Sequence, residues 1–220
     1  MKLVNKKSPQ IIKRMGLIVE TNQYCNISEQ YRTIRTNFLS SHNCLNSRTI
    51  TITSPKREDG KSTTASNFAI SLAQQGKKVL LIDADLRNPT LNITFKMENY
   101  VGLSDVLVGR NIIEDSIFRS GINGLDLMTS GPIPFNPTEL LGSKKMEILI
   151  ETVSILYDVI LFDTPPVLEV SDAKIIANQC DGQILVIRWG KTKNEEAIEA
   201  KKILESAKAK LLGVILNDKE

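Results

Sequence analysis

The chain has 220 residues, of which 41% are hydrophobic and 24% charged, with a formal net charge of only +3. A chain of this length buries a sizeable core, and one α/β domain is its simplest arrangement. The small charge does not favour nucleic acid as a partner, and no apolar run reaches the roughly 18 residues that cross a bilayer, so we expect a cytoplasmic protein.

The first 27 residues form a predicted basic arm ahead of the domain. They contain five cationic side chains close to the start, Lys2, Lys6, Lys7, Lys13 and Arg14. One interpretation is a solvated tail. The other is an attachment strip for an anionic membrane surface or an acidic partner. Both remain open.

From residue 28 onwards, predicted helices and strands alternate along the chain. Predicted helices cover 28–39, 62–75, 143–156, 171–178 and 194–207, and predicted strands cover 49–53, 79–82, 125–128, 159–162, 184–187 and 211–216. Continuous apolar strands are typical of parallel sheets that are buried on both faces. Residues 28–220 are therefore predicted to form one α/β domain, with a doubly wound, mostly parallel sheet flanked by helices on both faces.

The cysteine and histidine content excludes several kinds of site. Cys25, Cys44 and Cys180 are odd in number and contain no Cys-x-x-Cys pair, so reduced thiols are expected. His42 is the single histidine, which gives no support to a histidine metal cluster.

The short run Gly60-Lys61-Ser62-Thr63 lies between a predicted strand and a predicted helix. A phosphate-binding loop needs backbone N–H groups at a helix N-terminus, a lysine for the β- and γ-phosphates, and a hydroxyl for Mg²⁺. The alternative is a chance tripeptide at a helix start. The position between strand and helix favours a P-loop that binds a nucleoside triphosphate.

Carboxylates follow two of the buried strands. Asp83 and Asp85 come at the end of the strand after the P-loop helix, and Asp163 ends another apolar run. Ligands in open α/β sheets bind beyond the carboxyl ends of the strands, so these carboxylates can serve Mg²⁺ or act as a base. A helix cap at Asp85 or a simple turn at Asp163 is the structural alternative.

With these elements in place, the sequence resembles the bacterial protein-tyrosine kinases of capsule and exopolysaccharide synthesis, which are deviant P-loop ATPases. The resemblance covers residues 28–217. Besides the P-loop, its motifs are Glu-Gln-Tyr-Arg-Thr-Ile-Arg-Thr-Asn at 29–37, Val-Leu-Leu-Ile-Asp-Ala-Asp-Leu-Arg-Asn-Pro-Thr at 79–90, Gly-Leu-Ser-Asp-Val-Leu-Val-Gly at 102–109, Pro-Phe-Asn-Pro-Thr-Glu-Leu-Leu at 134–141, Asp-Thr-Pro-Pro at 163–166, Ser-Asp-Ala at 171–173, Asp-Gly at 181–182, Gly-Lys-Thr at 190–192 and Leu-Gly-Val-Ile-Leu-Asn at 212–217.

The resemblance implies an ATP- and Mg²⁺-dependent protein-tyrosine kinase. It implies that Lys61 contacts the β- and γ-phosphates, that Asp85 and Asp163 assist Ser62 at Mg²⁺, and that Asp83 deprotonates the tyrosine. The expected catalytic residues are Lys61, Asp83 and Asp85; the expected nucleotide-binding residues are Asp59, Gly60, Lys61, Ser62, Thr63 and Asn217; and the expected metal-binding residues are Ser62, Asp85 and Asp163. Asn217 is expected to recognise the adenine base.

The resemblance also implies partners. Glu29, Arg32 and Arg35 match a helix that contacts a neighbouring subunit in a homo-oligomeric ring, and their spacing places them on roughly one face. An exposed helix with internal ion pairs is the alternative. Further expected partners are a membrane-embedded polysaccharide chain-length regulator, which activates the kinase and recruits it to the membrane, and protein substrates bearing tyrosine. Nucleic acid is not expected.

Two features depart from the family pattern. Glu58 stands where a glycine is usual, two residues before Gly60, and brings a Cβ and a negative charge near the phosphates. In the same loop, Lys56 stands where related partitioning ATPases place a lysine that reaches across a dimer, although a solvated loop lysine is the simpler interpretation.

The second departure is that the family's C-terminal tyrosine cluster is not seen, since the tyrosines are Tyr24, Tyr31, Tyr100 and Tyr157.

Those departures keep alternatives open. Either a tyrosine tail was removed, or this member phosphorylates tyrosines on other proteins. A nucleotide-switched scaffold or ATPase of the same fold, with little kinase activity, is the alternative function. A partitioning-type ATPase on DNA or membrane is less compatible with the near-neutral charge and the Asp-Thr-Pro-Pro motif.

Overall fold

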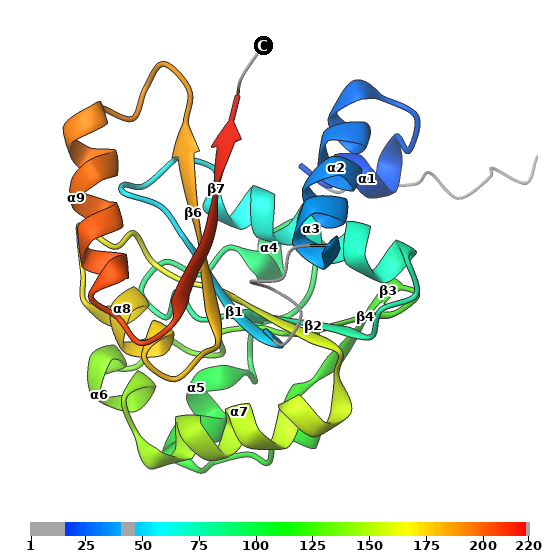
Figure 1. Ribbon diagram of the computed structural model, residues 1–220. Helices are drawn as coiled ribbons and strands as arrows, with labels where there is room; N and C mark the ends of the chain where they lie inside the picture. The colour runs from blue at the N-terminus through cyan, green and yellow to red at the C-terminus, as the bar shows by residue number, and fades with distance from the viewer. Residues whose placement is uncertain (1–15, 41–46, 219–220) are drawn as a thin grey trace, which may run out of the picture.

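The computed structural model describes residues 16–40 and 47–218, so the five basic residues of the arm, His42 and Cys44 lie outside the described residues (Figure 1). Within these ranges, helices and strands alternate. The helices are α1 (Ile18–Thr21), α2 (Asn26–Ser40), α3 (Lys61–Gln74), α4 (Leu91–Phe95), α5 (Leu103–Val108), the 3₁₀ helix η1 (Glu114–Ser116), α6 (Pro137–Leu141), α7 (Lys144–Leu156), α8 (Asp172–Ala177) and α9 (Asn194–Glu205). The strands are β1 (Thr49–Thr53), β2 (Val79–Asp83), β3 (Phe118–Ile122), β4 (Leu125–Met128), β5 (Val159–Asp163), β6 (Gly182–Arg188) and β7 (Lys210–Asn217).

One seven-stranded sheet runs through the molecule in the order β3-β4-β2-β5-β1-β6-β7. The pairings between β4 and β7 in this order are all parallel, and only the edge strand β3 is antiparallel. β1, β2 and β5 are buried along their whole length, as their continuous apolar or β-branched sequences predict. The predicted doubly wound, mostly parallel α/β fold is therefore confirmed.

The strands divide their side chains between two cores, because successive residues point to opposite faces of a sheet. Val79 and Leu81 of β2 belong to the core under α1, α2, α3 and α4, whereas Leu80 and Ile82 belong to the core under α5, α6, α7 and α8. A smaller cluster packs α9 and part of α8 against β6. Helices thus cover both faces of the sheet, as Figure 1 shows.

The described end of the predicted arm, from residue 16 on, lies against the domain. Leu17 and Val19 are buried in the core that contains α3. The backbone N–H of Val19 donates to Asn67 Oδ1 at 3.0 Å, and Asn67 Nδ2 donates to the carbonyl of Gly16 at 2.7 Å. The packed part of the chain therefore begins before residue 28, and α2 itself begins at Asn26.

Every predicted helix and strand is present, and each of its ends lies within two residues of the predicted end. The predictions omitted the antiparallel strand β3 and the short helices α1, α4, α5 and α6. These helices have four to six residues, which is too short for a helical period to show in the sequence. No helix within 16–40 or 47–218 has the length and apolar character needed to cross a membrane.

Candidate active site

The P-loop joins the end of β1 to the start of α3, as predicted. Gly60 adopts the left-handed conformation with φ of 91°, and a Cβ there would clash with the side-chain amide of Asn217. Glu58 also has a positive φ, 64°. This region favours glycine, so the residue that departs from the family pattern stands where a glycine would be least strained.

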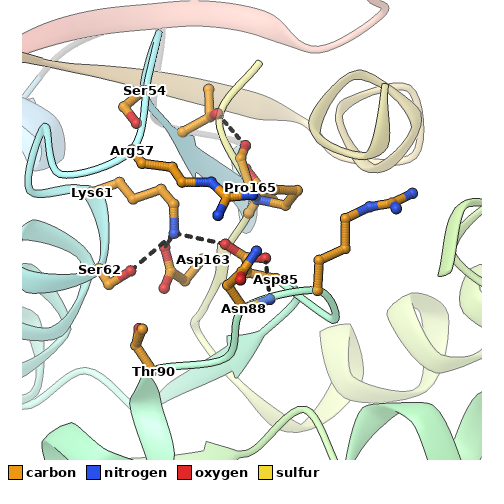
Figure 2. Close-up of polar contacts among 12 residues, drawn as sticks. Ser54, Arg57, Lys61, Ser62, Asp85, Asn88, Thr90, Asp163 and Pro165 are labelled. Atoms are coloured by element: carbon orange, nitrogen blue, oxygen red, sulfur yellow. Dashed lines mark hydrogen bonds and ion pairs between the residues drawn. The ribbon is translucent and has the colours of Figure 1, made fainter. Parts of the chain in front are cut away.

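Lys61, the first residue of α3, brings together the side chains predicted to form the site (Figure 2). Its Nζ lies 3.1 Å from Asp85 Oδ2, 3.6 Å from Asp163 Oδ1 and 3.1 Å from Ser62 Oγ. Burial alone would lower the pKa of Lys61, but the charges of Asp163 and Asp85 outweigh it and raise the pKa. Lys61 therefore remains a buried cation.

The two strand-end aspartates are fully buried and adjacent in the sheet. Asp83 of β2 and Asp163 of β5 occupy paired positions in the register. Neither oxygen of Asp163 has a hydrogen-bond partner among the described residues. Burial raises the pKa of Asp163 against the opposing charge of Lys61. Burial, reinforced by the charge of Asp163, raises the pKa of Asp83 to about 7.

Backbone donors hold the Asp83 carboxylate in place. Its Oδ2 accepts hydrogen bonds from the N–H groups of Thr90 and Leu91 at 3.0 and 2.9 Å, and its Oδ1 accepts from Asp85 at 3.2 Å. Asp83 thus organises the loop that follows β2, and its fully buried side chain is not among those that line the cavity.

An open cavity of about 300 Å³ lies above these groups. Its walls come from the P-loop, the start of α3 and the loop after β2, and are made by Arg57, Glu58, Gly60, Lys61, Ser62, Thr63, Asp85, Asn88 and Thr90. Four of the predicted nucleotide-binding residues therefore lie on one wall. Arg57, Asn88 and Thr90 were not predicted as site residues. Asn88 and Thr90 belong to the motif at 79–90, but nothing in that motif indicated that they face the cavity.

Asp59 and Asn217, the other two predicted nucleotide-binding residues, brace the P-loop from behind. Asp59 is buried, and its carboxylate accepts from the backbone N–H of Lys56 at 2.9 Å and from Thr192 Oγ1 at 3.0 Å. Asn217 Nδ2 donates to the Asp59 carbonyl at 3.1 Å. Arg188 Nη1 donates to the Glu58 carbonyl at 3.2 Å, so the ends of β6 and β7 hold the loop.

A second brace holds the loop after β2. Arg87 Nε donates to Asp172 Oδ2 at 2.8 Å, and Arg87 Nη2 donates to Thr138 Oγ1 at 2.8 Å and to Asp172 Oδ1 at 3.3 Å. Thr138 Oγ1 donates to Asp172 Oδ1 at 2.8 Å. Asp172 is fully buried, so this network ties the Asp85 loop to α6 and α8. The motifs contained these residues, but their spacing did not reveal the contact.

The residues predicted for a subunit contact lie on α2 with partners inside the chain. Glu29 forms an ion pair with Arg32, whose Nη2 also donates to the carbonyl of Gln23 at 2.7 Å. Arg35 Nη1 donates to the carbonyl of Ser71 on α3 at 2.8 Å. Glu29 is exposed, and the two arginines are partly exposed.

The fold and the loop define a class, and comparison with known proteins supports it. The family model described as an AAA domain matches residues 47–209. The septum site-determining protein MinD from Pyrococcus horikoshii, solved with Mg-ADP, superposes with a TM-score of 0.66 at 27% identity, over 77% of this chain and 69% of that one. The chain is a P-loop ATPase domain, as predicted.

Two further relatives identify the family within this class. The chain is 51% identical to the tyrosine-protein kinase YwqD of Bacillus subtilis (strain 168), over 88% of this chain and 81% of YwqD. The crystal structure of the chimerical protein CapA2B2 superposes with a TM-score of 0.88 at 38% identity, over 94% of this chain and 91% of that one. The chain therefore belongs to the bacterial tyrosine-protein kinase family, and the predicted resemblance and enzyme class are confirmed.

Proposed function

We propose that the cavity binds ATP with Mg²⁺ and that the site transfers the γ-phosphoryl group to tyrosine hydroxyls on proteins. The observation that carries this proposal is the position of Lys61, a buried cation at the P-loop that stands against two carboxylates and faces an open cavity. Phosphoryl transfer needs mainly positioning and neutralisation of charge, which this arrangement supplies.

The side chains around Lys61 fit a magnesium ion. Ser62 Oγ and Asp85 lie at the cavity wall, and the buried oxygens of Asp163 have no hydrogen-bond partner among the described residues. Mg²⁺ prefers such oxygen ligands and keeps several waters, which can reach a carboxylate that lies deeper. Ser62, Asp85 and Asp163 would hold the ion, which supplies charge neutralisation at the phosphates.

Asp83 is the proposed base. In the transfer, the bond between the γ-phosphorus and its bridging oxygen breaks and ADP leaves, while the tyrosine oxygen bonds to that phosphorus. The phenolic proton passes to an Asp83 oxygen through a bridging water, because the carboxylate is fully buried and does not line the cavity. A pKa of about 7 matches a base that works near neutral pH. Asp83 Oδ1 accepts only one long backbone bond, at 3.2 Å, and is the oxygen less engaged in the loop.

Similar proteins support the proposal that this chain works together with a second protein. The similar structure CapA2B2 is that of a chimerical protein, which supports the idea that a second polypeptide joins this kinase. We propose that this partner is a membrane-embedded polysaccharide chain-length regulator, and that the kinase acts in capsular or exopolysaccharide synthesis at the membrane. Glu29, Arg32 and Arg35 are proposed to contact a neighbouring subunit in a ring, by exchanging their partners within the chain for partners across the interface.

The test is phosphorylation of tyrosine by the whole chain. The purified protein is incubated with γ-labelled ATP, Mg²⁺ and a tyrosine-containing polypeptide, with and without the cytoplasmic segment of the candidate membrane partner. Mass spectrometry should locate the label on tyrosine, and omission of Mg²⁺ should abolish it. Normal ATP binding with no labelled tyrosine under either condition would contradict the proposal and favour a nucleotide-switched scaffold.

A further inference from the structure

Arg57 is a second cation at the cavity. Of the nine described residues that line the cavity, only Lys61 and Arg57 are positively charged. In Figure 2 the Arg57 side chain extends from the P-loop across the site, above Lys61. The two cations differ in environment, because Lys61 is buried in the floor whereas the Arg57 side chain is 61% exposed.

Glu169 fixes Arg57 at two points. Glu169 Oε1 accepts a hydrogen bond from the Arg57 backbone N–H at 3.1 Å, and Oε2 accepts from Arg57 Nε at 2.7 Å. Both oxygens of the carboxylate are engaged on the backbone side of the guanidinium group. The terminal Nη1 and Nη2 atoms form no hydrogen bond with any of the described residues, so the outer face of the group is available to a ligand.

The charge of the cavity explains why a second cation is useful. Lys61 already faces Asp85 and Asp163 at 3.1 and 3.6 Å, so its charge is largely offset. Glu58 adds a further negative charge to the wall. Even with Mg²⁺ bound by Asp85 and Asp163, a polyphosphate would gain from a further positive group on the cavity wall, and the planar guanidinium group is suited to two parallel bonds to phosphate oxygens.

We propose that Arg57 binds the terminal phosphate of the nucleoside triphosphate through Nη1 and Nη2, and that Glu169 positions it. This inference rests on the proposed function for the identity of the nucleotide. Arg57 thereby offsets the charge that Glu58 brings to the loop, and it contributes to stabilising the charge that develops on the transferred group.

The neighbouring Lys56 provides a matched control. Its Nζ forms an ion pair with Glu196 Oε1 at 2.6 Å on α9, and Lys56 does not line the cavity. Lys56 and Arg57 are both exposed cations of the same loop. Removal of either charge changes the net charge of the loop equally, but only Arg57 faces the ligand.

The experiment compares ATP and ADP binding by calorimetry for the wild-type chain and four variants, Arg57→Gln, Arg57→Lys, Glu169→Gln and Lys56→Gln. Loss of a charge-assisted hydrogen bond at an exposed site should weaken ATP binding about tenfold in Arg57→Gln. ADP binding should change less than about twofold, since ADP lacks the terminal phosphate. Arg57→Lys should be intermediate, because it keeps the charge and loses the planar fork.

Two of the variants separate a specific contact from general electrostatics. Lys56→Gln should bind ATP like the wild type. Glu169→Gln should weaken ATP binding about threefold and leave ADP binding unchanged, with an unaltered melting temperature, as expected of a positioning residue. The proposal is overturned if Arg57→Gln binds ATP normally, if it loses ATP and ADP affinity equally, or if Lys56→Gln loses as much affinity. Because binding is measured without an acceptor, a chain that fails to phosphorylate tyrosine refutes the proposed function without deciding the role of Arg57.

Discussion

The two sides of the active site are built in contrasting ways. On one side, Asp83 and Asp163 end two paired central strands and are fully buried, with backbone N–H groups holding Asp83 in place. On the other side, Lys56, Arg57 and Glu58 of the P-loop are exposed. That side is held by side chains from β6, β7 and the loops after β5 and β6.

The contrast shows where this fold tolerates change. A strand-end carboxylate in the core has one position and one set of neighbours, so a substitution there changes a charge or a hydrogen bond that no solvent can replace. A loop that is braced from outside can accept an unusual residue such as Glu58 as long as the braces persist. We therefore expect the largest effects of substitution at the buried floor and the smallest at the loop.

Lys61→Met should cause the largest loss of activity, because Lys61 follows directly on the P-loop and its side chain also contacts the buried carboxylates. The variant removes a phosphate-binding cation and leaves Asp85 and Asp163 without their counter-charge. Tyrosine phosphorylation should fall by about a thousandfold or more, on the scale of a lost transition-state contact, and ATP binding should weaken. Lys56→Met is the control and should remain active. Activity of Lys61→Met within tenfold of the wild type would contradict the central role of Lys61.

Asp83→Asn should separate chemistry from binding. The amide keeps a carbonyl oxygen for the N–H groups of Thr90 and Leu91 but cannot take the phenolic proton. We expect ATP affinity to persist and the transfer rate to fall about a hundredfold, the usual contribution of a general base. Since the pKa of Asp83 is about 7, the wild-type rate should rise through neutral pH, and this rise should be lost in the variant. Near-normal transfer by Asp83→Asn would remove Asp83 as the base.

The same carboxyl group predicts how stability depends on pH. Its pKa rises from 3.8 to about 7 on folding, so between these values the folded state binds a proton that the unfolded state has lost. The free energy of unfolding should therefore fall as the pH rises from about 4 to 7, and Asp163 contributes in the same direction. Thermal melts across this range should show Asp83→Asn melting higher than the wild type at pH 8 and similarly at pH 4. A wild-type melting temperature that rises steadily across this window would contradict the prediction.

Asp172→Asn tests the brace on the loop after β2 and should have an intermediate effect. Asp172 is buried and accepts from Arg87 and Thr138, and the variant loses the charged partner of Arg87. We expect about 2 kcal/mol less stability, the scale of a charged hydrogen bond. Below the melting temperature, kcat should fall about tenfold with little change in KM for ATP. Thr138→Val, which removes one hydroxyl, should show a smaller change in kcat. If the variant is less stable but has a normal kcat, the hydrogen bonds of Arg87, Thr138 and Asp172 stabilise the fold without contributing to catalysis.

The same contrast between the buried strand ends and the exposed P-loop explains which site residues the sequence alone could predict. Asp83 and Asp163 were identifiable because apolar runs end at both, and parallel strands bring their carboxyl ends to one edge. The Arg57–Glu169 and Arg87–Asp172 pairs join residues 112 and 85 positions apart. No periodicity or spacing reveals such a pair, since it depends on how surface loops pack after the sheet has formed. The role of Asp59 as a buried brace was hidden for the same reason.

Glu58→Gly should have the smallest effect, and its sign is informative. At a φ of 64°, a side chain with a Cβ costs about 1–2 kcal/mol, which glycine avoids. Glycine also gives the unfolded chain more freedom, which offsets about 0.4–1 kcal/mol of that gain. The net stabilisation should therefore be about 0.5 kcal/mol in chemical denaturation, with Lys56→Gly, at a position without positive φ, destabilising instead. ATP binding should strengthen slightly as the negative charge leaves the cavity wall. If Glu58→Gly destabilises the chain, the Glu58 side chain makes contacts that outweigh its backbone strain, and the loop is as specifically built as the floor.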